Sequence, residues 1–527
     1  MARQLFFIIS GFILLLVAGL GLIWPQSWWV MVFVVPLVLL GLFDASQTKH
    51  TILRIYPLVG RLRYLFESIR PEIQQYFVES DINGQPINRE FRSLVYQRAK
   101  GVRDTRPFGT LFDVYRPGYE WINQSLSPTP LAESAPRLWV GGPQCTQPYE
   151  ASYLNISAMS FGALSRHAIL ALNQGAKLGG FAHNTGEGGL SPYHQQPGGD
   201  LIWQIGTGYF GCRSHDGQFD PEAFTTRAQH KQVKMIEIKL SQGAKPGHGG
   251  ILPAAKLTAE IAGIRGVPMG HDVVSPSGHS AFSSPVGLLE FVARLRELSG
   301  GKPVGFKLCI GIKSEFLAIC KAMQQTGIHP DFITVDGSEG GTGAAPIELT
   351  NSVGMPMRDG LSFIHSSLVG IGVRQHIRLI AAGKVLSAFH ILRDLALGAD
   401  MVNSARAMMF ALGCIQSRSC NTNRCPTGVA TQDPARYKQL NINNKARRVA
   451  HYHATTMHAV MELLASAGLH VPSDIQPHHI MRRVRGPTIQ SYAQLYPGIE
   501  CDCLKENGHV PEAWQEDWQQ ADPEKWR

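Results

Sequence analysis

The sequence predicts an α/β fold, a (β/α)8 TIM barrel with an N-terminal transmembrane helical hairpin and a helical C-terminal extension. Three observations lead to it. Eight short β-rich runs alternate with helical stretches, glycine and polar residues follow those runs, and two long uncharged apolar runs open the chain. The 527 residues are 44% hydrophobic and 17% charged, against roughly 25% charged in typical soluble domains, which excludes a disordered chain.

The apolar N-terminus predicts a membrane hairpin. Residues 5–24 form an uncharged run of 20 residues, enough to span ~30 Å of hydrocarbon. The second run, Trp28–Phe43, has 16 residues and fits a short span, a re-entrant segment or an interfacial segment. A cleaved signal peptide is the alternative, but the second run follows without a small-residue cleavage site.

The distribution of charge predicts how the hairpin is oriented in the membrane. The net charge is +9, and residues 45–110 hold eleven Lys or Arg against six Asp or Glu. Basic residues flanking a span favour the cytoplasmic side, so we expect the inner (cytoplasmic) membrane with the body facing the cytoplasm. Nine cysteines, an odd number, agree with a reducing compartment. No nucleic-acid-binding motif accompanies the positive charge, so no nucleic acid partner is expected.

Four regions are expected along the chain. They are a transmembrane hairpin over 1–43, a juxtamembrane helical region over 44–110, the barrel with a cysteine motif over 111–435, and a C-terminal extension over 436–527. The histidines of the extension, His451, His453 and His458, lack accompanying carboxylates, so they are interpreted as surface or core residues rather than metal ligands.

Eight segments are predicted as the barrel strands. They are Tyr153–Ala158, Phe181–Asn184, Leu201–Ile205, Val233–Lys239, Pro303–Leu308, Asp331–Val335, Lys384–Ala388 and Met401–Ser404. A doubly wound open sheet would give similar local patterning. Polar and glycine residues after the runs favour the barrel, because barrel active sites are built at the carboxyl ends of the strands.

The cysteines Cys414, Cys420 and Cys425 are spaced C-x5-C-x4-C and followed by Pro-Thr-Gly. Iron–sulfur clusters take cysteine thiolates, and three of them indicate a three-iron cluster or an incompletely ligated cubane. Structural zinc would need a fourth ligand, which the neighbouring sequence lacks.

A glycine-rich segment, residues 336–343, follows the sixth predicted strand. Its sequence is Asp-Gly-Ser-Glu-Gly-Gly-Thr-Gly, and its backbone N–H groups suit an anion. Gly383-Lys384 and Ser404-Ala405-Arg406 fall in the seventh and eighth strand regions, where barrels frequently hold a phosphate. Together these segments predict a phosphorylated cofactor.

Basic residues are expected at the mouth of the barrel. Lys239 and Lys245 flank a flexible loop at the end of the fourth predicted strand, and Arg265 follows the next helical stretch. Converging cations suit a dicarboxylate, although solvated surface cations are the alternative. Lys307 lies inside an apolar strand, where an unpaired lysine is costly.

The chain resembles the FMN-binding synthase domain of glutamate synthases over roughly residues 110–435, and the shorter membrane-anchored bacterial forms over nearly its whole length. The resemblance is carried by five segments: Ile156–Ser165, Asn184–Gly189, Lys239–Gly250, Asp336–Pro346 and the cysteine motif continuing to Gln432. It implies a (β/α)8 barrel that holds FMN and a [3Fe–4S] cluster and reduces 2-iminoglutarate, formed from 2-oxoglutarate and ammonia, to glutamate.

The resemblance also implies roles for individual residues. Flavin contacts are expected from Ser157, Ala158, Met159, Ser160 and Lys307, with Lys307 at the N1–O2 edge of the ring. Phosphate and cofactor contacts are expected from Asp336, Gly340, Gly341, Thr342, Gly383, Ala405 and Arg406. The oxo-acid is expected to contact Gly186, Lys239, Lys245 and Arg265. The expected catalytic residues are Lys245, Lys307 and Glu187. The expected cluster ligands are the three cysteines of the motif.

Three departures from the family pattern concern the substrate and phosphate regions. Leu190 stands where the family commonly has an acidic residue, and Ile251 stands where it has a glutamine, so two polar contacts near the oxo-acid are missing. At the seventh strand, the usual glycine pair is altered to Ala382-Gly383. Glutamine hydrolysis is not expected from this chain, so ammonia would come free or from a separate glutaminase.

The expected function is FMN- and iron–sulfur-dependent oxidoreduction at a CH–NH2 group, most simply glutamate synthesis. No nicotinamide-binding fingerprint is present, so electrons are expected from an external donor such as ferredoxin or a reductase subunit. Two alternatives stay open. One is a related membrane-linked enzyme that acts on a different amine or 2-oxo acid and passes electrons to a quinone or another membrane carrier, and the other is a non-catalytic barrel scaffold.

Overall fold

The computed structural model describes residues 2–102 and 104–526, and the chain divides into two compact units, Met1–Arg89 and Glu90–Arg527. The region borders expected at residues 43, 110 and 435 stay predictions.

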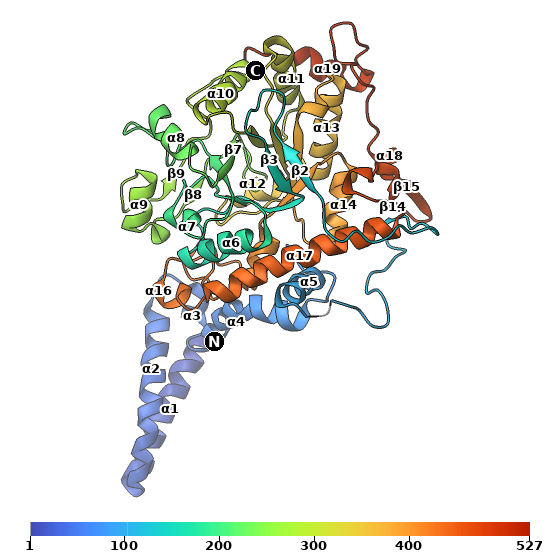
Figure 1. Ribbon diagram of the computed structural model, residues 1–527. Helices are drawn as coiled ribbons and strands as arrows, with labels where there is room; N and C mark the ends of the chain where they lie inside the picture. The colour runs from blue at the N-terminus through green and yellow to red at the C-terminus, as the bar shows by residue number, and fades with distance from the viewer. Residues whose placement is uncertain (1, 103, 527) are drawn as a thin grey trace. The chain divides into compact units, whose positions relative to one another are not determined.

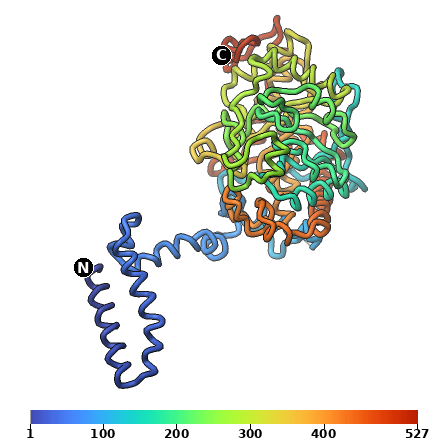
Figure 2. The backbone as a smooth tube through the Cα atoms, turned by 90° about the vertical axis from the view of Figure 1, so that its left-hand side faces the viewer, coloured from blue at the N-terminus to red at the C-terminus, as the bar shows by residue number. Residues whose placement is uncertain are grey.

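The first unit begins with two antiparallel helices that lie side by side (Figure 2). Helix α1 spans Ala2–Ile23, and a 3-10 turn, Pro25–Val30, leads into α2, Met31–Ser46. Gly41 allows the close approach, because a Cβ there would lie 2.2 Å from the Phe6 ring. The helical runs Ala2–Ile23 and Pro25–Ser46 are each 22 residues, long and apolar enough to cross a membrane, a test that a signal sequence also passes.

The helical segment that contains the second apolar run is longer than the 16 uncharged residues. It also includes the start of the 3-10 turn and the polar end of α2. The first unit also contains α3 (Thr51–Ile55), α4 (Val59–Ile73) and a π-turn (Gln74–Val78). Helix α5 (Arg89–Lys100) begins at the last residue of that unit and belongs to the second unit.

Eight parallel strands close into a barrel in the second unit (Figure 1), which confirms the predicted fold class. In order around the barrel they are β4 (Leu154–Ile156), β5 (His183–Asn184), β6 (Leu201–Ile205), β7 (Val233–Lys239), β10 (Val304–Cys309), β11 (Phe332–Asp336), β12 (Arg378–Ala382) and β13 (Met401–Ser404). An open doubly wound sheet is excluded because β13 pairs with β4.

The seventh predicted strand, Lys384–Ala388, is wrong. The strand is β12, Arg378–Ala382, and residues 383–387 form the loop after it. Lys384 has a positive φ of 47°, which a strand cannot contain, and Ser387 caps the following helix by accepting a hydrogen bond from the His390 N–H.

Helices surround the barrel. They are α6 (Arg166–Gly179), α7 (Pro192–Gln195), α8 (Pro221–Ala228), α9 (Ala259–Arg265), α10 (Pro285–Leu298), α11 (Lys313–Thr326), α12 (Ile347–Ser352), α13 (Met357–Gly370), α14 (Ala388–Ala396), α15 (Arg406–Leu412), α16 (Pro434–Tyr437), α17 (Ile442–Ser466), α18 (Tyr492–Leu495) and α19 (Glu512–Gln520). Short 3-10 turns cover Ala254–Lys256, Arg374–His376, Pro472–Asp474 and Pro477–His479.

Three small antiparallel sheets complete the unit. They are β2 (Arg137–Val140) with β3 (Tyr149–Ser152), β8 (Ile251–Leu252) with β9 (Val273–Val274), and β1 (Glu120–Ile122) with β14 (Ile480–Arg485) and β15 (Thr488–Ser491).

The long helix α17 packs along α6 on the outside of the barrel (Figure 1). Val449 of α17 lies against Gly175 of α6, where a Cβ would come within 2.7 Å. His453 is buried, stacks on Phe181 at 4.0 Å and hydrogen-bonds the Leu154 carbonyl, whereas His458 is exposed beside Glu462. Among the described residues these histidines therefore serve as core and surface groups, as expected.

Candidate active site

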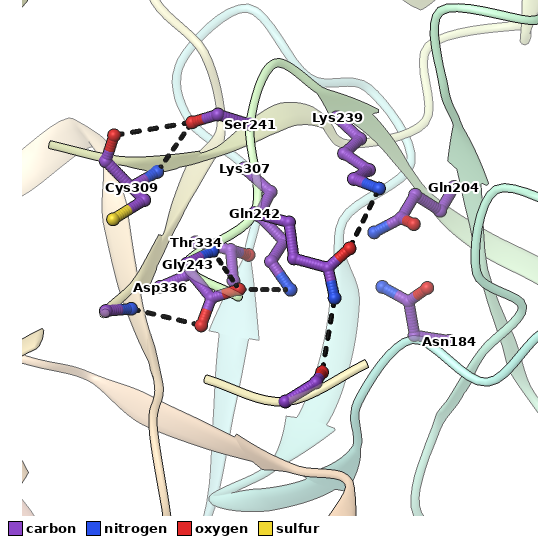
Figure 3. A network of polar contacts seen from close by, with 12 residues as sticks. Asn184, Gln204, Lys239, Ser241, Gln242, Gly243, Lys307, Cys309, Thr334 and Asp336 are labelled. Carbon is purple, nitrogen blue, oxygen red and sulfur yellow. Dashed lines mark hydrogen bonds and ion pairs between the residues drawn. The ribbon is translucent and has the colours of Figure 1, made fainter. Parts of the chain in front are cut away.

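An ion pair lies at the carboxyl ends of two neighbouring barrel strands. Lys307 of β10 places its Nζ 3.1 Å from Oδ2 of Asp336, the last residue of β11, and both side chains are buried (Figure 3). The backbone N–H groups of Gly243 and Gly337 donate to the same carboxylate. Burial alone would lower the pKa of Lys307, but Asp336 and Glu237 raise it above its ordinary value.

Glu237 is a fully buried carboxyl group in the interior of the barrel, one strand from Lys307. Its oxygens accept hydrogen bonds from Asn184 (2.8 Å), Gln204 (2.6 Å) and Thr334 (2.6 Å), which come from three other strands. These three hydrogen bonds fix the side chains inside the barrel. The sequence analysis predicted no role for Glu237. Its position as a charged residue inside an otherwise apolar strand was the signal that could have indicated one.

A pocket opens beside this network. Its wall combines segments that follow five of the barrel strands and is formed by Ser160, Ala163, Glu187, Lys245, Gly250, Ile251, Leu252, Pro253, Lys256, Arg265, Ser275, Thr342, Gly343, Ala344 and Cys420. The sequence-predicted residues Glu187, Lys245 and Arg265 are therefore brought together in one pocket, which Ser160 and Thr342 also line.

Glu187 is the carboxylate among these cations. Its Oε1 lies 2.9 Å from Nζ of Lys239, which also donates to Oε1 of Gln242 at 3.1 Å. Burial alone would raise the pKa of Glu187, but Lys239, Lys245 and Arg265 together lower it. Glu187 is thus held in its ionised form.

Lys245 and Arg265 carry the remaining positive charge of the pocket. Burial lowers the pKa of Lys245 to about 8 and that of Arg265 to about 10. Arg265 is 5% exposed, donates from Nη2 to the Phe161 carbonyl and stacks on Phe210, but its Nε has no hydrogen-bond partner among the described residues. A buried guanidinium with a free donor fits an anion from outside the chain.

The loop after β4 contains Ser157–Ser160 and lies against the loop after β5. The Met159 N–H donates to the Asn184 carbonyl, and the His194 ring contacts the Met159 carbonyl. Gly186 has φ 65°, and a Cβ there would lie 2.9 Å from the Ser160 nitrogen. Only glycine therefore permits this contact, which brings the predicted flavin loop and Gly186 together.

The predicted phosphate residues also converge. Arg406, at the start of α15, donates from Nη2 to the Glu339 carbonyl at 2.8 Å and lies beside Gly341. Burial lowers the pKa of Arg406 and of Lys384, and neither forms an ion pair within 4 Å with any described residue. Gly340, Gly341, Thr342, Gly383 and Ala405 belong to the same loops. Two cations without a carboxylate partner beside an open glycine loop fit a phosphate.

The cysteine trio lies in the loop that follows α15. Cys420 reaches the pocket wall, and Cys414, Cys420 and Cys425 are near enough that each charge affects the others. Burial raises the pKa of the Cys414 thiol to about 12. Burial would also raise the pKa of Cys425, but hydrogen bonds, chiefly the one with Thr427, lower it below its ordinary value. In residues 2–102 and 104–526, no group of three or more His, Cys, Asp or Glu side chains is arranged to hold a metal ion.

Two further residues belong to the site and were not predicted. His279 contacts the Lys239 carbonyl through Nε2 at 2.9 Å and the Tyr209 hydroxyl through Nδ1 at 3.1 Å. Lys256 lies between the pocket and the cysteine loop and donates to the Cys420 carbonyl at 3.2 Å. Neither has a local sequence signal, because the partners of both are distant in the chain.

Comparisons with known proteins agree with this arrangement. Residues 145–470 match the family model described as the conserved region in glutamate synthase. The glutamate synthase large subunit-like protein YerD of Bacillus subtilis is 38% identical over 496 residues, covering 86% of this chain and 94% of that protein. An archaeal glutamate synthase (NADPH) of Methanocaldococcus jannaschii is 37% identical and covers 60% of this chain; the chain spans 58% of that relative's length.

Among solved structures, a mandelate oxidase variant aligns with a TM-score of 0.42 and 12% identity, covering 71% of this chain and 88% of that one. Family membership therefore rests on sequence: the family model covers more than half of the chain, and YerD matches nearly end to end. The chain belongs to the glutamate synthase family.

Proposed function

We propose that this oxidoreductase reduces 2-iminoglutarate, formed from 2-oxoglutarate and ammonia, to glutamate, with FMN, a [3Fe–4S] cluster and electrons from an external donor. One observation carries the proposal. A buried pocket holds more positive than negative charge and lies between the loops predicted to bind flavin and the loop that carries the cysteines.

The charge count favours a dicarboxylate. The ion pair between Lys239 and Glu187 balances itself, and Lys256 donates to the Ala163 and Cys420 carbonyls, which leaves Lys245 and Arg265 for two carboxylates of a ligand. Arg265 offers planar, bidentate recognition and Lys245 a point charge. Because both are buried, each gains more from a bound anion than a surface cation would.

The residues present fit FMN. Arg406, Lys384 and the loop of Gly340–Thr342 would hold the phosphate, with Gly383 and Ala405 nearby, and Ser157–Ser160 would line the ring. Lys307, kept charged by Asp336, would place a cation at the electron-rich edge of the ring. Bound FMN would supply hydride-transfer chemistry to an imine carbon.

The three cysteines fit an iron–sulfur cluster by chemistry. Their thiols share one loop and interact electrostatically, as ligands of one cluster would, and Cys420 also lines the pocket. A cluster held there would adjoin the pocket through Cys420 and would accept electrons from an external donor such as ferredoxin or a reductase subunit.

The chain's own side chains have separate tasks in this proposal. Arg265 and Lys245 bind the carboxylates of the oxo-acid, and Gly186 leaves room beside Ser160. The ionised Glu187 stabilises the positive charge of the protonated imine, which is the form that accepts hydride. Lys239 holds Glu187 in place, and Gln242 and His279 hold Lys239.

A second candidate is a related reaction on a different amine or 2-oxo acid. Ile251, Leu252 and Pro253 give the pocket an apolar wall, which would suit a substrate with an apolar end. The two apolar N-terminal helices fit anchoring at the inner membrane with the barrel in the cytoplasm, where a quinone or another membrane carrier could exchange electrons.

The test is a substrate screen on the anaerobically purified full chain. With a reduced dye as donor, we expect glutamate from 2-oxoglutarate plus ammonia, and flavin reoxidation that depends on both. A matched screen uses 2-oxo acids of similar length that end in a methyl group. If only those acids reoxidise the flavin, the second candidate replaces the first; if none does, both fail.

Substrate affinity is expected to fall as pH rises through about 8. Lys245 has its pKa lowered to about 8 by burial, so it is protonated below that pH and binds a carboxylate, and it loses its charge above it. We expect the Kd of 2-oxoglutarate, measured by flavin absorbance, to rise about tenfold between pH 7 and pH 9. The Lys245→Arg variant should show a smaller rise over that range, and an equal rise in both proteins would contradict this role.

A further inference from the structure

Lys256 is a buried cation between the substrate pocket and the cysteine loop. It ends the 3-10 turn Ala254–Lys256 that follows β8, and it is 2% exposed. Its Nζ donates to the carbonyl of Ala163, in the loop after β4, and to the carbonyl of Cys420 at 3.2 Å. One ammonium group thus joins two loops that are more than 250 residues apart in the sequence.

Neutral carbonyls do not balance this charge. No carboxylate among the described residues forms an ion pair within 4 Å with the Lys256 ammonium. Burial lowers the pKa of Lys256 to about 8, the thiols of Cys420 and Cys425 oppose that shift, and Arg265 adds to it. A buried ammonium is costly without a negative partner, so the cysteine sulfurs are its electrostatic counterpart.

The loop after β4 is held from both sides. Lys256 and Arg265 donate to the carbonyls of Ala163 and Phe161, and Gln432, beyond the cysteine motif, donates to those of Gly162 and Leu164. Any shift of the Cys420 loop is therefore transmitted to a segment that also forms the pocket wall.

We propose that Lys256 is a positioning residue for the iron–sulfur cluster, which fixes the Cys420 loop and supplies the positive charge that favours the reduced cluster. This rests on the cluster of the proposed function and not on the identity of the substrate. A one-electron reduction adds one negative charge to the cluster, and a fixed cation in a buried setting stabilises that charge.

The test compares Lys256→Met with Lys256→Arg in the anaerobically purified full chain. The readouts are iron per chain and the midpoint potential of the cluster EPR signal in a dye titration, neither of which requires turnover. We expect Lys256→Met to lower the equilibrium constant for one-electron reduction about tenfold, a shift of about 59 mV to more negative potential. Lys256→Arg keeps the charge and should restore the wild-type potential.

Lys302 offers a matched control. It is also a buried lysine, 8% exposed, whose Nζ donates to two carbonyls, those of Ala228 at 2.6 Å and His230 at 3.1 Å, but it lines a different cavity. Lys302→Met should leave iron and potential unchanged. If Lys256→Met folds by circular dichroism but loses iron while Lys256→Arg and Lys302→Met keep it, the positioning role is supported directly.

Three outcomes would overturn the proposal: an unchanged potential with full iron in Lys256→Met, the same loss in Lys302→Met, or no iron in the wild-type chain. Failure of glutamate synthesis is a separate result. A wild-type protein that carries the cluster and ignores 2-oxoglutarate would reject the proposed reaction and leave this test intact.

Discussion

Replacing Cys420 with serine is expected to abolish the cluster signal while the flavin stays bound. The cysteine loop lies beyond α15, and Cys420 reaches the pocket wall, whereas Arg406, which we propose holds the phosphate, lies at the other end of that helix. Loss of an outer contact to a metal ligand costs about 10–100-fold in affinity, so loss of a ligand should cost more than about 100-fold.

The measurement is iron and flavin content per chain with the low-temperature EPR spectrum, after anaerobic purification. We expect FMN at the wild-type level, iron near zero, and loss of turnover with a one-electron donor. Cys501→Ser is the matched control, since Cys501 is a free, exposed cysteine outside the motif. An unchanged EPR spectrum in Cys420→Ser would contradict the ligand assignment, and an equal loss in Cys501→Ser would show a general effect of thiol removal.

The barrel could be predicted from sequence because each strand is a short apolar run that glycine or polar residues follow. Seven of the eight predicted runs overlap observed strands, and β6, β7 and β13 have the predicted bounds. The seventh failed because the loop after β12 contains the apolar pair Val385-Leu386, which a local pattern does not distinguish from a strand. The positive φ of Lys384 and the cap formed by Ser387 are local backbone features that apolar periodicity does not encode.

The candidate site was predictable where its residues share a motif. The cysteine spacing and the glycine-rich loop are local patterns, so their chemistry follows from residue type. Contacts between distant segments were not predictable: Lys256 meets Cys420 164 positions away, and Glu237 meets Thr334 97 positions away. Such pairs depend on how the barrel closes, and a single sequence carries no direct record of that.

Replacing Lys307 with methionine is expected to destabilise the barrel, because Asp336 would keep a buried charge without its cation. The two side chains are 7% and 6% exposed, and their ion pair joins adjacent strands. Removing one partner of a buried pair typically costs 3–5 kcal/mol, and the two backbone N–H donors to Asp336 place the expected loss near the lower end, about 3 kcal/mol. Denaturant unfolding of the apoprotein measures it.

A double-mutant cycle separates the lost pair from the lost lysine. Asp336→Asn removes the charge that Lys307 neutralises, so the combined Lys307→Met and Asp336→Asn variant should be more stable than Lys307→Met alone. Additive losses would contradict an energetic coupling between the two side chains. FMN titration of the same four proteins then tests whether the charge of Lys307 also stabilises bound flavin. If it does, the double variant should recover stability but not flavin affinity. Neutralising Asp336 removes the unpaired charge, but it cannot replace the missing cation.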